Sequence, residues 1–208
     1  MKLYPISLKL DAVPCIVVGG GTVALRKVQS LLESAACVTL VSPRLCPKLG
    51  MLYKKKAFRY VRSVYREKFL KGMFLVIAAT DRPGVNEQVA RDAALRRLLV
   101  NVVDYPDWCN FYVPALIRKN GVLISISTQG AFPGLAKKIR QECMAVVGGY
   151  SGNLKRIVAL RNQIKQECGN KRERKKMIER LLSPSVMALI GQKKIRTFSD
   201  LKKHRGVL

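Results

Sequence analysis

The sequence has few of the side chains from which metal and redox sites are usually built. Its 208 residues include a single histidine, His204, and six cysteines that form no C-x-x-C pair. This scarcity argues against a zinc cage or a dithiol redox motif, so we expect free thiols and no bound metal. Any metal chemistry would have to rest on carboxylates or on the substrate itself.

Long apolar runs are also missing. No run approaches the roughly 20 residues that a membrane-spanning helix needs. Residues 1–5 hold too few apolar side chains to begin a signal peptide. Because scattered, unpaired cysteines also fit a reducing compartment, we expect a cytoplasmic protein with no membrane partner.

Acidic residues are scarce relative to basic ones. The chain holds 13 Asp and Glu against 39 Lys and Arg, a formal net charge of +26, and residues 151–208 carry 16 basic and 4 acidic residues. A field of this sign attracts anions such as nucleic acid, acidic lipid or a polycarboxylate, although a lysine-rich composition without any partner explains it equally well. Aromatic residues make up only 7% and no nucleic-acid-binding motif is present, so we predict no specific nucleic-acid partner.

Three consecutive glycines follow the first strongly apolar segment. Residues 15–18 are typical of a buried strand, Gly19, Gly20 and Gly21 come next, and a segment with helical spacing of apolar residues follows. Gly19, Gly21 and Ala24 fill the G-x-G-x-x-G/A pattern. In this pattern one glycine permits the turn, another lets a diphosphate approach the backbone, and the small residue permits close packing. The pattern predicts dinucleotide binding at the start of a helix, and an ordinary turn between strand and helix is the alternative.

Strands and helices alternate through the first half of the chain. Further strands are expected at residues 38–41, 58–61, 73–79 and 99–103, and a helix at residues 83–97. We expect Asp81 to cap the first turn of that helix. Such alternation indicates an α/β fold with a doubly wound parallel sheet.

Beyond residue 104 the alternation stops. A strand is expected at residues 122–127, and helices at residues 133–147, 151–167, 172–182 and 184–190. Breaks are expected at Gly148-Gly149 and at Gly169-Asn170. The second half of the chain therefore reads as a helical module, with basic faces from residue 150 onward.

Polar residues stand where the expected strands end, which is where ligands bind in open α/β sheets. Asp104 directly follows one strand, so we expect its carboxylate to face a bound nicotinamide and to take a proton from the substrate. Capping of the turn that begins at Tyr105 is the alternative. After the second strand, Ser42 could bond a ribose hydroxyl, and Arg44 could accept a 2′-phosphate or be a surface residue without a role. These residues leave NAD and NADP both open.

Several further motifs occur in order along the chain, and together they are more specific than the glycine turn. They are Tyr4-Pro5-Ile6, residues 17–27, Val41-Ser42-Pro43, residues 77–81, Asn86, residues 101–104, Cys109-Asn110-Phe111, Val113-Pro114-Ala115 and Ile126-Ser127-Thr128. Over residues 3–145 the sequence resembles the precorrin-2 dehydrogenase family, which forms the dehydrogenase module of siroheme synthases.

The resemblance implies a fold and a reaction. It implies a Rossmann-like NAD-binding domain over residues 1–113, a dimerisation segment over 114–149 and a small helical C-terminal domain over 150–208, in a homodimer. The implied reaction is NAD-dependent oxidation of precorrin-2 to sirohydrochlorin in siroheme biosynthesis, with precorrin-2 supplied by a separate enzyme. Some members also insert ferrous iron into sirohydrochlorin, which gives a bifunctional alternative. A non-catalytic protein that binds a nucleotide or a tetrapyrrole is a further one.

Site residues are carried over from the same resemblance, with Asp104 in the catalytic role. The expected cofactor-binding residues are Gly19, Gly20, Gly21, Thr22, Val23, Ser42, Pro43, Arg44, Ala79, Thr80 and Val103. The expected substrate-binding residues are Asn110, Ser127, Thr128, Lys137 and Arg140. Read without the resemblance, Ser127 and Thr128 could offer hydroxyl and N–H groups to an anion or could form a plain turn.

The high charge gains a role under this resemblance, because precorrin-2 is a polycarboxylate. We hypothesise that part of its binding surface comes from Arg118, Lys119, Lys137, Lys138, Arg140, Arg156 and Arg161. The chain departs from the family pattern at Trp108 and at residues 129–134, where the bulky Phe132 replaces a small polar residue. We expect Gln129 and Phe132 to affect the substrate fit and any iron insertion more than cofactor binding.

Overall fold

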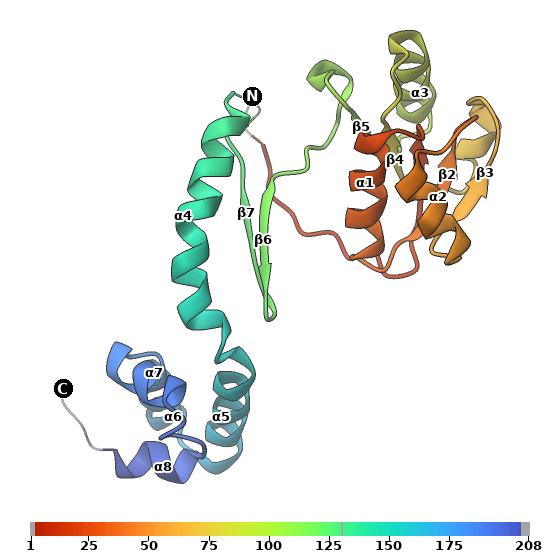
Figure 1. The fold of residues 1–208 in the computed structure, drawn as a ribbon. Helices are drawn as coiled ribbons and strands as arrows, with labels where there is room; N and C mark the ends of the chain where they lie inside the picture. Colours follow the sequence, from red (N-terminus) through yellow and green to blue (C-terminus); the bar gives the residue numbers. More distant parts are fainter. Residues whose placement is uncertain (1–2, 130, 205–208) are drawn as a thin grey trace. The chain divides into compact units, whose positions relative to one another are not determined.

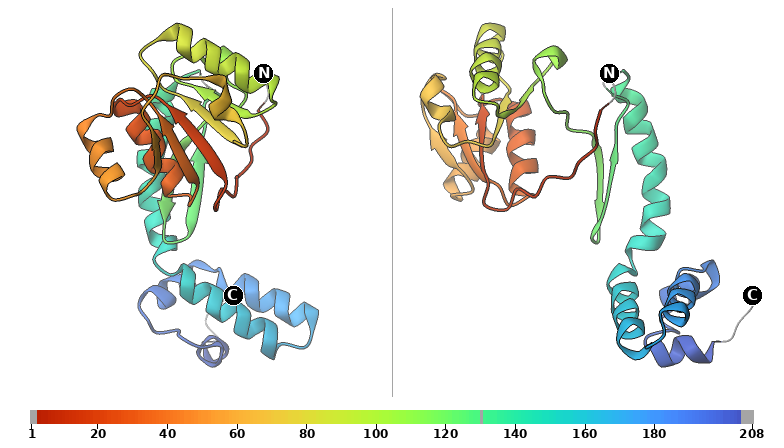
Figure 2. Two further views of the ribbon diagram at one scale, coloured as in Figure 1. Left: turned by 90° about the vertical axis from the view of Figure 1, so that its right-hand side faces the viewer. Right: turned by 180° about the vertical axis from the view of Figure 1, so that it is seen from behind.

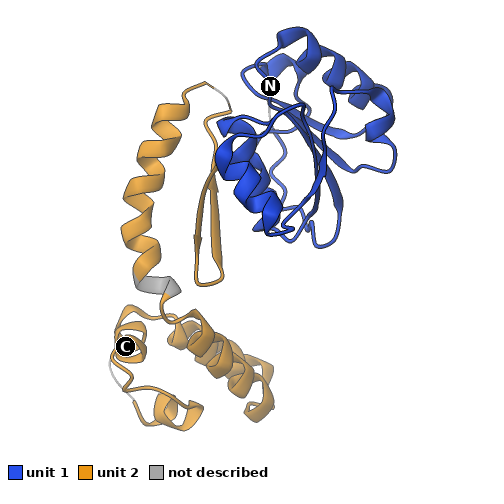
Figure 3. Ribbon diagram, turned by 45° about the vertical axis from the view of Figure 1, so that its right-hand side comes forward, with its two compact units in different colours: residues 1–113 blue, residues 114–208 orange. Residues whose placement is uncertain are grey.

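The protein folds as two compact units. The structure, a computed structural model, describes residues 3–129 and 131–204, and for residues 149–151 their backbone. The units are Met1–Val113 and Pro114–Leu208 (Figure 3). The division of the second unit near residue 149 stays a prediction.

The first unit is built on a parallel sheet (Figure 1). Its strands are β1 (Pro14–Val18), β2 (Cys37–Val41), β3 (Arg59–Val61), β4 (Leu75–Ala78) and β5 (Leu99–Val102), in the order β3-β2-β1-β4-β5. In this register the last residue of β1, Val18, is paired with both Val41 and Ala78, so three strands end together at one edge. The predicted α/β fold with a doubly wound parallel sheet is confirmed.

Helices cover both faces of this sheet. They are α1 (Thr22–Leu32), α2 (Pro47–Lys54) and α3 (Pro83–Leu95), with short 3-10 helices at Glu67–Leu70 (η1) and Pro106–Trp108 (η2). Val17 of β1 packs in one apolar core with Val28 of α1 and Leu49 of α2. Its neighbour Ile16 packs in a second core with Val89 of α3, because alternate residues of a strand point to opposite faces. The sheet is thus buried on both sides, which explains the continuous apolar runs in its strands.

The prediction that Asp81 caps α3 is wrong. The N-cap residue is Arg82, and no side chain bonds the first turn from that position. Instead, Thr80 Oγ1 accepts the Arg82 N–H at 3.2 Å and donates to Asn86 Oδ1 at 2.7 Å. The amide of Asn86, which is 2% exposed, also donates to the Thr80 carbonyl at 3.0 Å. A buried amide inside the helix therefore holds this turn, in place of a carboxylate before it.

The second unit contains a hairpin, a long helix and a group of shorter helices. These elements are β6 (Ala115–Lys119), β7 (Val122–Ile126), α4 (Pro133–Ser151), α5 (Leu154–Glu167), α6 (Lys171–Leu181), α7 (Pro184–Gly191) and α8 (Phe198–Lys203). The antiparallel hairpin lies along α4 (Figure 2). Helices α5 to α8 enclose their own core, in which Leu160, Ile164, Ile190 and Phe198 are fully or almost fully buried.

Two expectations for this unit need correction. Helix α4 continues through Gly148-Gly149, where a break was predicted, because glycine weakens a helix by only about 1 kcal/mol and packing overrides that cost. The break falls later, and α5 begins at Leu154 and not near residue 151. The sequence reading also missed β6, although both residues of the turn Asn120-Gly121 have positive φ, as a two-residue hairpin requires.

Among the residues that the structure describes, every helix is too short or too polar to cross a bilayer.

Candidate functional site

The three glycines after β1 serve three different purposes. Gly19 has φ of +127°, and a Cβ there would lie 2.2 Å from the Ala79 carbonyl oxygen. A Cβ at Gly20 would lie 1.9 Å from the Arg44 carbonyl oxygen, because the loops after β1 and β2 touch there. A Cβ at Gly21 would meet nothing within 4 Å. The first two glycines are therefore needed to fold the turn, and the third leaves its backbone open to a ligand.

Helix α1 begins at this turn with its amides uncapped. Gly21 is the N-cap residue, no side chain bonds the first turn, and no acidic residue lies in it. The first helical bond runs from the Leu25 N–H to the Gly21 carbonyl at 3.0 Å. The amides of Thr22 and Val23 precede that bond, so the helix presents free N–H groups and a partial positive charge. An anion such as a diphosphate is the ligand that this arrangement favours.

A pocket of about 630 Å³ opens at the turn. Segments that follow four strands form its walls, namely residues 18–21, 41–46, 63–65 and 79–82, joined by Val85. Eight of the expected cofactor residues line it: Gly19, Gly20, Gly21, Ser42, Pro43, Arg44, Ala79 and Thr80. Thr22, Val23 and Val103 are not in its lining. The volume suits a ligand larger than a simple ion.

The wall after β2 is shaped by a buried serine. Ser42, 7% exposed, donates its hydroxyl to the Arg44 carbonyl at 2.7 Å, and its own carbonyl accepts from the Tyr60 hydroxyl at 2.9 Å. This bonding uses the Ser42 hydroxyl proton within the turn, and a contact of Ser42 with the ribose stays a prediction. Within the described part of the chain, the exposed Arg44 guanidinium has no hydrogen bond or ion pair, so it is available to an anion.

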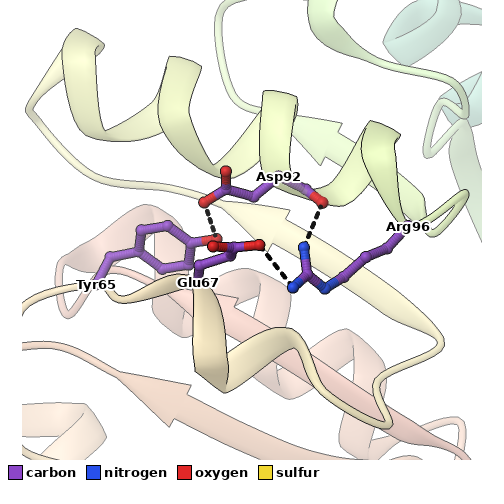
Figure 4. A network of polar contacts seen from close by, with 4 residues as sticks. All are labelled: Tyr65, Glu67, Asp92 and Arg96. Atoms are coloured by element: carbon purple, nitrogen blue, oxygen red, sulfur yellow. Dashed lines mark hydrogen bonds and ion pairs between the residues drawn. The ribbon is translucent and has the colours of Figure 1, made fainter.

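The wall after β3 is fastened by a polar network that sequence reasoning missed (Figure 4). Tyr65 lines the pocket and donates its hydroxyl to Asp92 Oδ2 on α3 at 2.9 Å. Arg96 pairs with Glu67 Oε1 at 2.6 Å and bonds the Asp92 carbonyl at 3.4 Å. Burial, and then the bond to Asp92, raise the pKa of Tyr65, so it stays protonated and holds the loop. The four residues form no local pattern, because their contacts join segments far apart in the sequence.

Asp104 lies at the carboxyl end of β5, beyond the last bonded residue, Val103, whose N–H donates to the Ala78 carbonyl at 3.0 Å. Its backbone is left-handed, with φ of +66°, and its side chain is exposed. It is not in the pocket lining, and among the described residues its carboxylate has no partner. It caps no turn, since η2 begins after Tyr105 without a side-chain bond. A strained backbone and an unpartnered carboxylate therefore coincide at the end of a strand.

The expected substrate residues fall in both units. In the first, the Asn110 side-chain amide donates to the Leu98 carbonyl and accepts from the Val100 N–H, both at 2.8 Å. In the second, Ser127 and Thr128 accept backbone N–H groups from Gln129 and Phe132 in the turn before α4. Lys137 and Arg140 lie on the first turns of α4, with Lys137 exposed and Arg140 partly so. Asn110 thus supports the edge of β5, and the assignment of all five residues to the substrate stays a prediction.

The chain is similar to an NAD(P)-binding family and to siroheme synthases. Residues 6–115 match a family model described as "Putative NAD(P)-binding". The siroheme synthase of Pseudoalteromonas translucida is 37% identical over 191 residues, which cover 91% of this chain and 40% of that protein. That of Methylobacillus flagellatus is 39% identical over 176 residues, which cover 84% of this chain and 38% of that protein. This chain therefore spans about two fifths of the length of these relatives.

A solved structure has the same fold. The precorrin-2 dehydrogenase SirC matches with a TM-score of 0.79 over 97% of this chain and 100% of that chain, at 24% sequence identity.

Proposed function

The chain belongs to the NAD(P)-binding family whose model matches its residues 6–115, and on this premise we propose that it is an NAD-dependent dehydrogenase that oxidises precorrin-2 to sirohydrochlorin. The predicted resemblance to siroheme synthases is confirmed by relatives that are 37% and 39% identical. The observation that carries the proposal is the glycine turn, whose open backbone at Gly21 adjoins a pocket at the carboxyl ends of β1, β2 and β4.

The residues of the pocket fit a dinucleotide. Space for a ligand lies over Gly21, the first amides of α1 are uncapped, and the Arg44 guanidinium is available to a phosphate or ribose. A bound nicotinamide dinucleotide would supply the hydride acceptor. Buried Asn86 and half-buried Tyr65 hold two of the walls in place, so the pocket is organised before a ligand binds. The preference for NAD over NADP rests on the family resemblance.

Asp104 is proposed to take the proton that leaves the macrocycle with the hydride. Its carboxylate is exposed and unpartnered within the described residues, so it is free to accept a proton from a substrate. We expect Asp104→Asn to lower kcat by about 10² to 10⁴ at unchanged unfolding temperature, because asparagine tolerates the same left-handed backbone. Full turnover by this variant would remove Asp104 from the mechanism.

Assembly and location are part of the same proposal. We propose a cytoplasmic homodimer that associates through residues 114–149. Apolar side chains at 43–64% exposure support this surface, namely Leu123 on the hairpin and Leu135, Met144 and Val146 on α4. Ser127, Thr128, Lys137 and Arg140 in this segment are the proposed contacts to substrate carboxylates.

The test is an anaerobic assay of the purified protein with enzymatically generated precorrin-2. NADH formation and sirohydrochlorin absorbance are followed with NAD and, in parallel, with NADP. We expect turnover with NAD to exceed turnover with NADP. A protein that binds NAD and tetrapyrrole without turnover would contradict the proposal and direct attention to Phe132, which stands 62% exposed beside the turn before α4.

A further inference from the structure

Side chains of the segment after β5 form hydrogen bonds with the backbone groups on the outer edge of that strand, where a neighbouring strand would otherwise pair. β5 is the last strand of the sheet, so one row of its backbone groups has no strand to pair with. Asn110 covers the first part of that row: its N–H donates to the Val100 carbonyl at 3.1 Å, and its amide bonds Leu98 and Val100. Cys109 covers the rest, since its Sγ accepts the Val102 N–H at 3.1 Å.

Cys109 contacts the chain on both sides of Asp104. Besides accepting the Val102 N–H, its Sγ lies 3.3 Å from the Val102 carbonyl and 3.3 Å from the Tyr105 carbonyl, and it can donate to either. Burial raises the pKa of the Cys109 thiol, so it keeps the proton that this donation requires. One sulfur atom therefore bonds the residue two before Asp104 and the residue directly after it.

The conformation of Asp104 needs such a support. Its φ of +66° is uncommon for a residue with a side chain and persists only where the surroundings impose it. Across the turn itself the Tyr105 N–H reaches the Val102 carbonyl only at 3.5 Å, and the Tyr105 carbonyl also accepts the Trp108 N–H at 3.2 Å. The stacked rings of Tyr105 and Trp108, 4.3 Å apart, then pack the far side of the loop against the core.

The support is anchored in the interior. Asn101, 8% exposed, donates to the Phe111 carbonyl at 3.1 Å and to Cys109 Sγ at 3.6 Å. Its Oδ1 accepts from Lys27 Nζ of α1 at 3.3 Å. The helix that begins at the glycine turn is thus joined through side chains to the segment that holds Asp104.

We propose that Cys109 is a positioning residue, whose thiol fixes the turn from Val102 to Tyr105 and so directs the Asp104 carboxylate toward the substrate. The inference rests on the proposed function, in which Asp104 takes a proton. In this role the Cys109 thiol acts through hydrogen bonds and keeps its oxidation state. Cys109 does not line the pocket, so this role needs no contact with the cofactor.

The test is a set of variants of this chain: Cys109→Ala, Cys109→Ser, Asp104→Asn and the double variant of Cys109→Ala with Asp104→Asn, with Cys37→Ala as the control. Cys37 is an exposed cysteine at the start of β2. We expect Cys109→Ala to lower kcat about tenfold or more while Kd for NAD stays unchanged, since small misplacements of catalytic groups are costly. Cys109→Ser, which keeps a donor and an acceptor, should recover part of the loss.

The double variant distinguishes positioning from general damage. In the Asp104→Asn background Cys109→Ala should cause no further loss of kcat, because the carboxylate it positions is gone. An equal loss in both backgrounds, or unchanged kcat in Cys109→Ala, overturns the inference. Full turnover by Asp104→Asn overturns both the inference and the proposed role of Asp104.

A readout without turnover keeps the inference testable whatever the reaction. Amide hydrogen exchange should become faster over residues 101–106 in Cys109→Ala and keep its original rates over residues 14–25 around the glycine turn. Unchanged exchange at residues 101–106 contradicts the inference, even if the protein proves inactive toward precorrin-2.

Discussion

Gly20 lies where the loops after β1 and β2 touch, and a methyl group at this position would force the two loops apart. A Cβ there would lie 1.9 Å from the Arg44 carbonyl oxygen and 2.5 Å from the Ser42 hydroxyl oxygen. We expect Gly20→Ala to push the loop after β2 away, to destabilise the fold by about 1–3 kcal/mol and to weaken NAD binding about tenfold or more. Chemical denaturation and titration calorimetry with NAD measure the two effects.

Gly21→Ala is the matched control, because its Cβ would meet no protein atom within 4 Å. We expect this variant to keep its stability and to lose affinity for NAD, since the methyl group would occupy space intended for the ligand. NAD affinity that stays at the value of the parent chain in both variants would show that the glycine turn does not bind the dinucleotide.

Among the elements, the loop after β3 is joined to α3 by the hydrogen bond of Tyr65. Tyr65 donates to Asp92 of α3, and its pKa is raised by burial and then by that bond. The folded state therefore holds the phenol proton more tightly than the unfolded chain. The stability that this provides is complete below the ordinary tyrosine pKa of about 10 and falls as the pH rises above it.

Tyr65→Phe tests this contribution. At pH 7 the variant should be less stable by about 1–3 kcal/mol, since it leaves the Asp92 carboxylate without its donor. The difference in unfolding free energy between the two proteins should shrink as the pH rises beyond 10. Urea denaturation from pH 7 to 11 measures it, with Tyr53→Phe as a tyrosine control that has no such bond in the described structure. A difference that is constant with pH would contradict the raised pKa.

The strands could be predicted because a sheet buried on both faces leaves continuous apolar runs such as residues 75–78. Helix α2 could not, because only Leu49 among its residues is buried and basic residues interrupt the pattern. The cap of α3 was misassigned for a different reason. Thr80 and Asn86 satisfy that turn together, and only the folded chain shows that Asn86 points back toward Thr80.

In the candidate site, too, some residues could be predicted from a local sequence pattern and others could not. Gly19 and Gly21 carry a local spacing that predicts their use, as does Asp104 by its place after a strand. The role of Gly20 depends on a loop more than twenty residues further along the chain, and Tyr65 depends on α3. Such contacts are set by the sheet order, so a single sequence without the fold offers no signal for them.

At the scale of the whole molecule, the dominant feature is a net charge of +26. Few acidic partners neutralise it. On α6, for example, Lys171, Arg172 and Lys176 are exposed and have no ion pair among the described residues. A field of this size accelerates the encounter with an anionic ligand and is screened by salt, with a Debye length of about 10 Å at 0.1 M ionic strength.

This field gives the last prediction. Precorrin-2 carries many carboxylates and NAD few charges, so raising the salt from about 20 to 300 mM should lower kcat/KM for precorrin-2 several-fold while changing that for NAD little. Replacing Lys171, Arg172 and Lys176 by glutamate should weaken that salt dependence. The matched control replaces Lys48, Lys54 and Lys55 by glutamate, three exposed residues on or next to α2. This control should change the salt dependence less, because helices α5 to α8 are expected to provide part of the substrate surface. Equal effects of the two triple variants would show that the net charge acts as a whole and not through α6. A value of kcat/KM for precorrin-2 that does not respond to salt would show that the charge does not assist substrate binding.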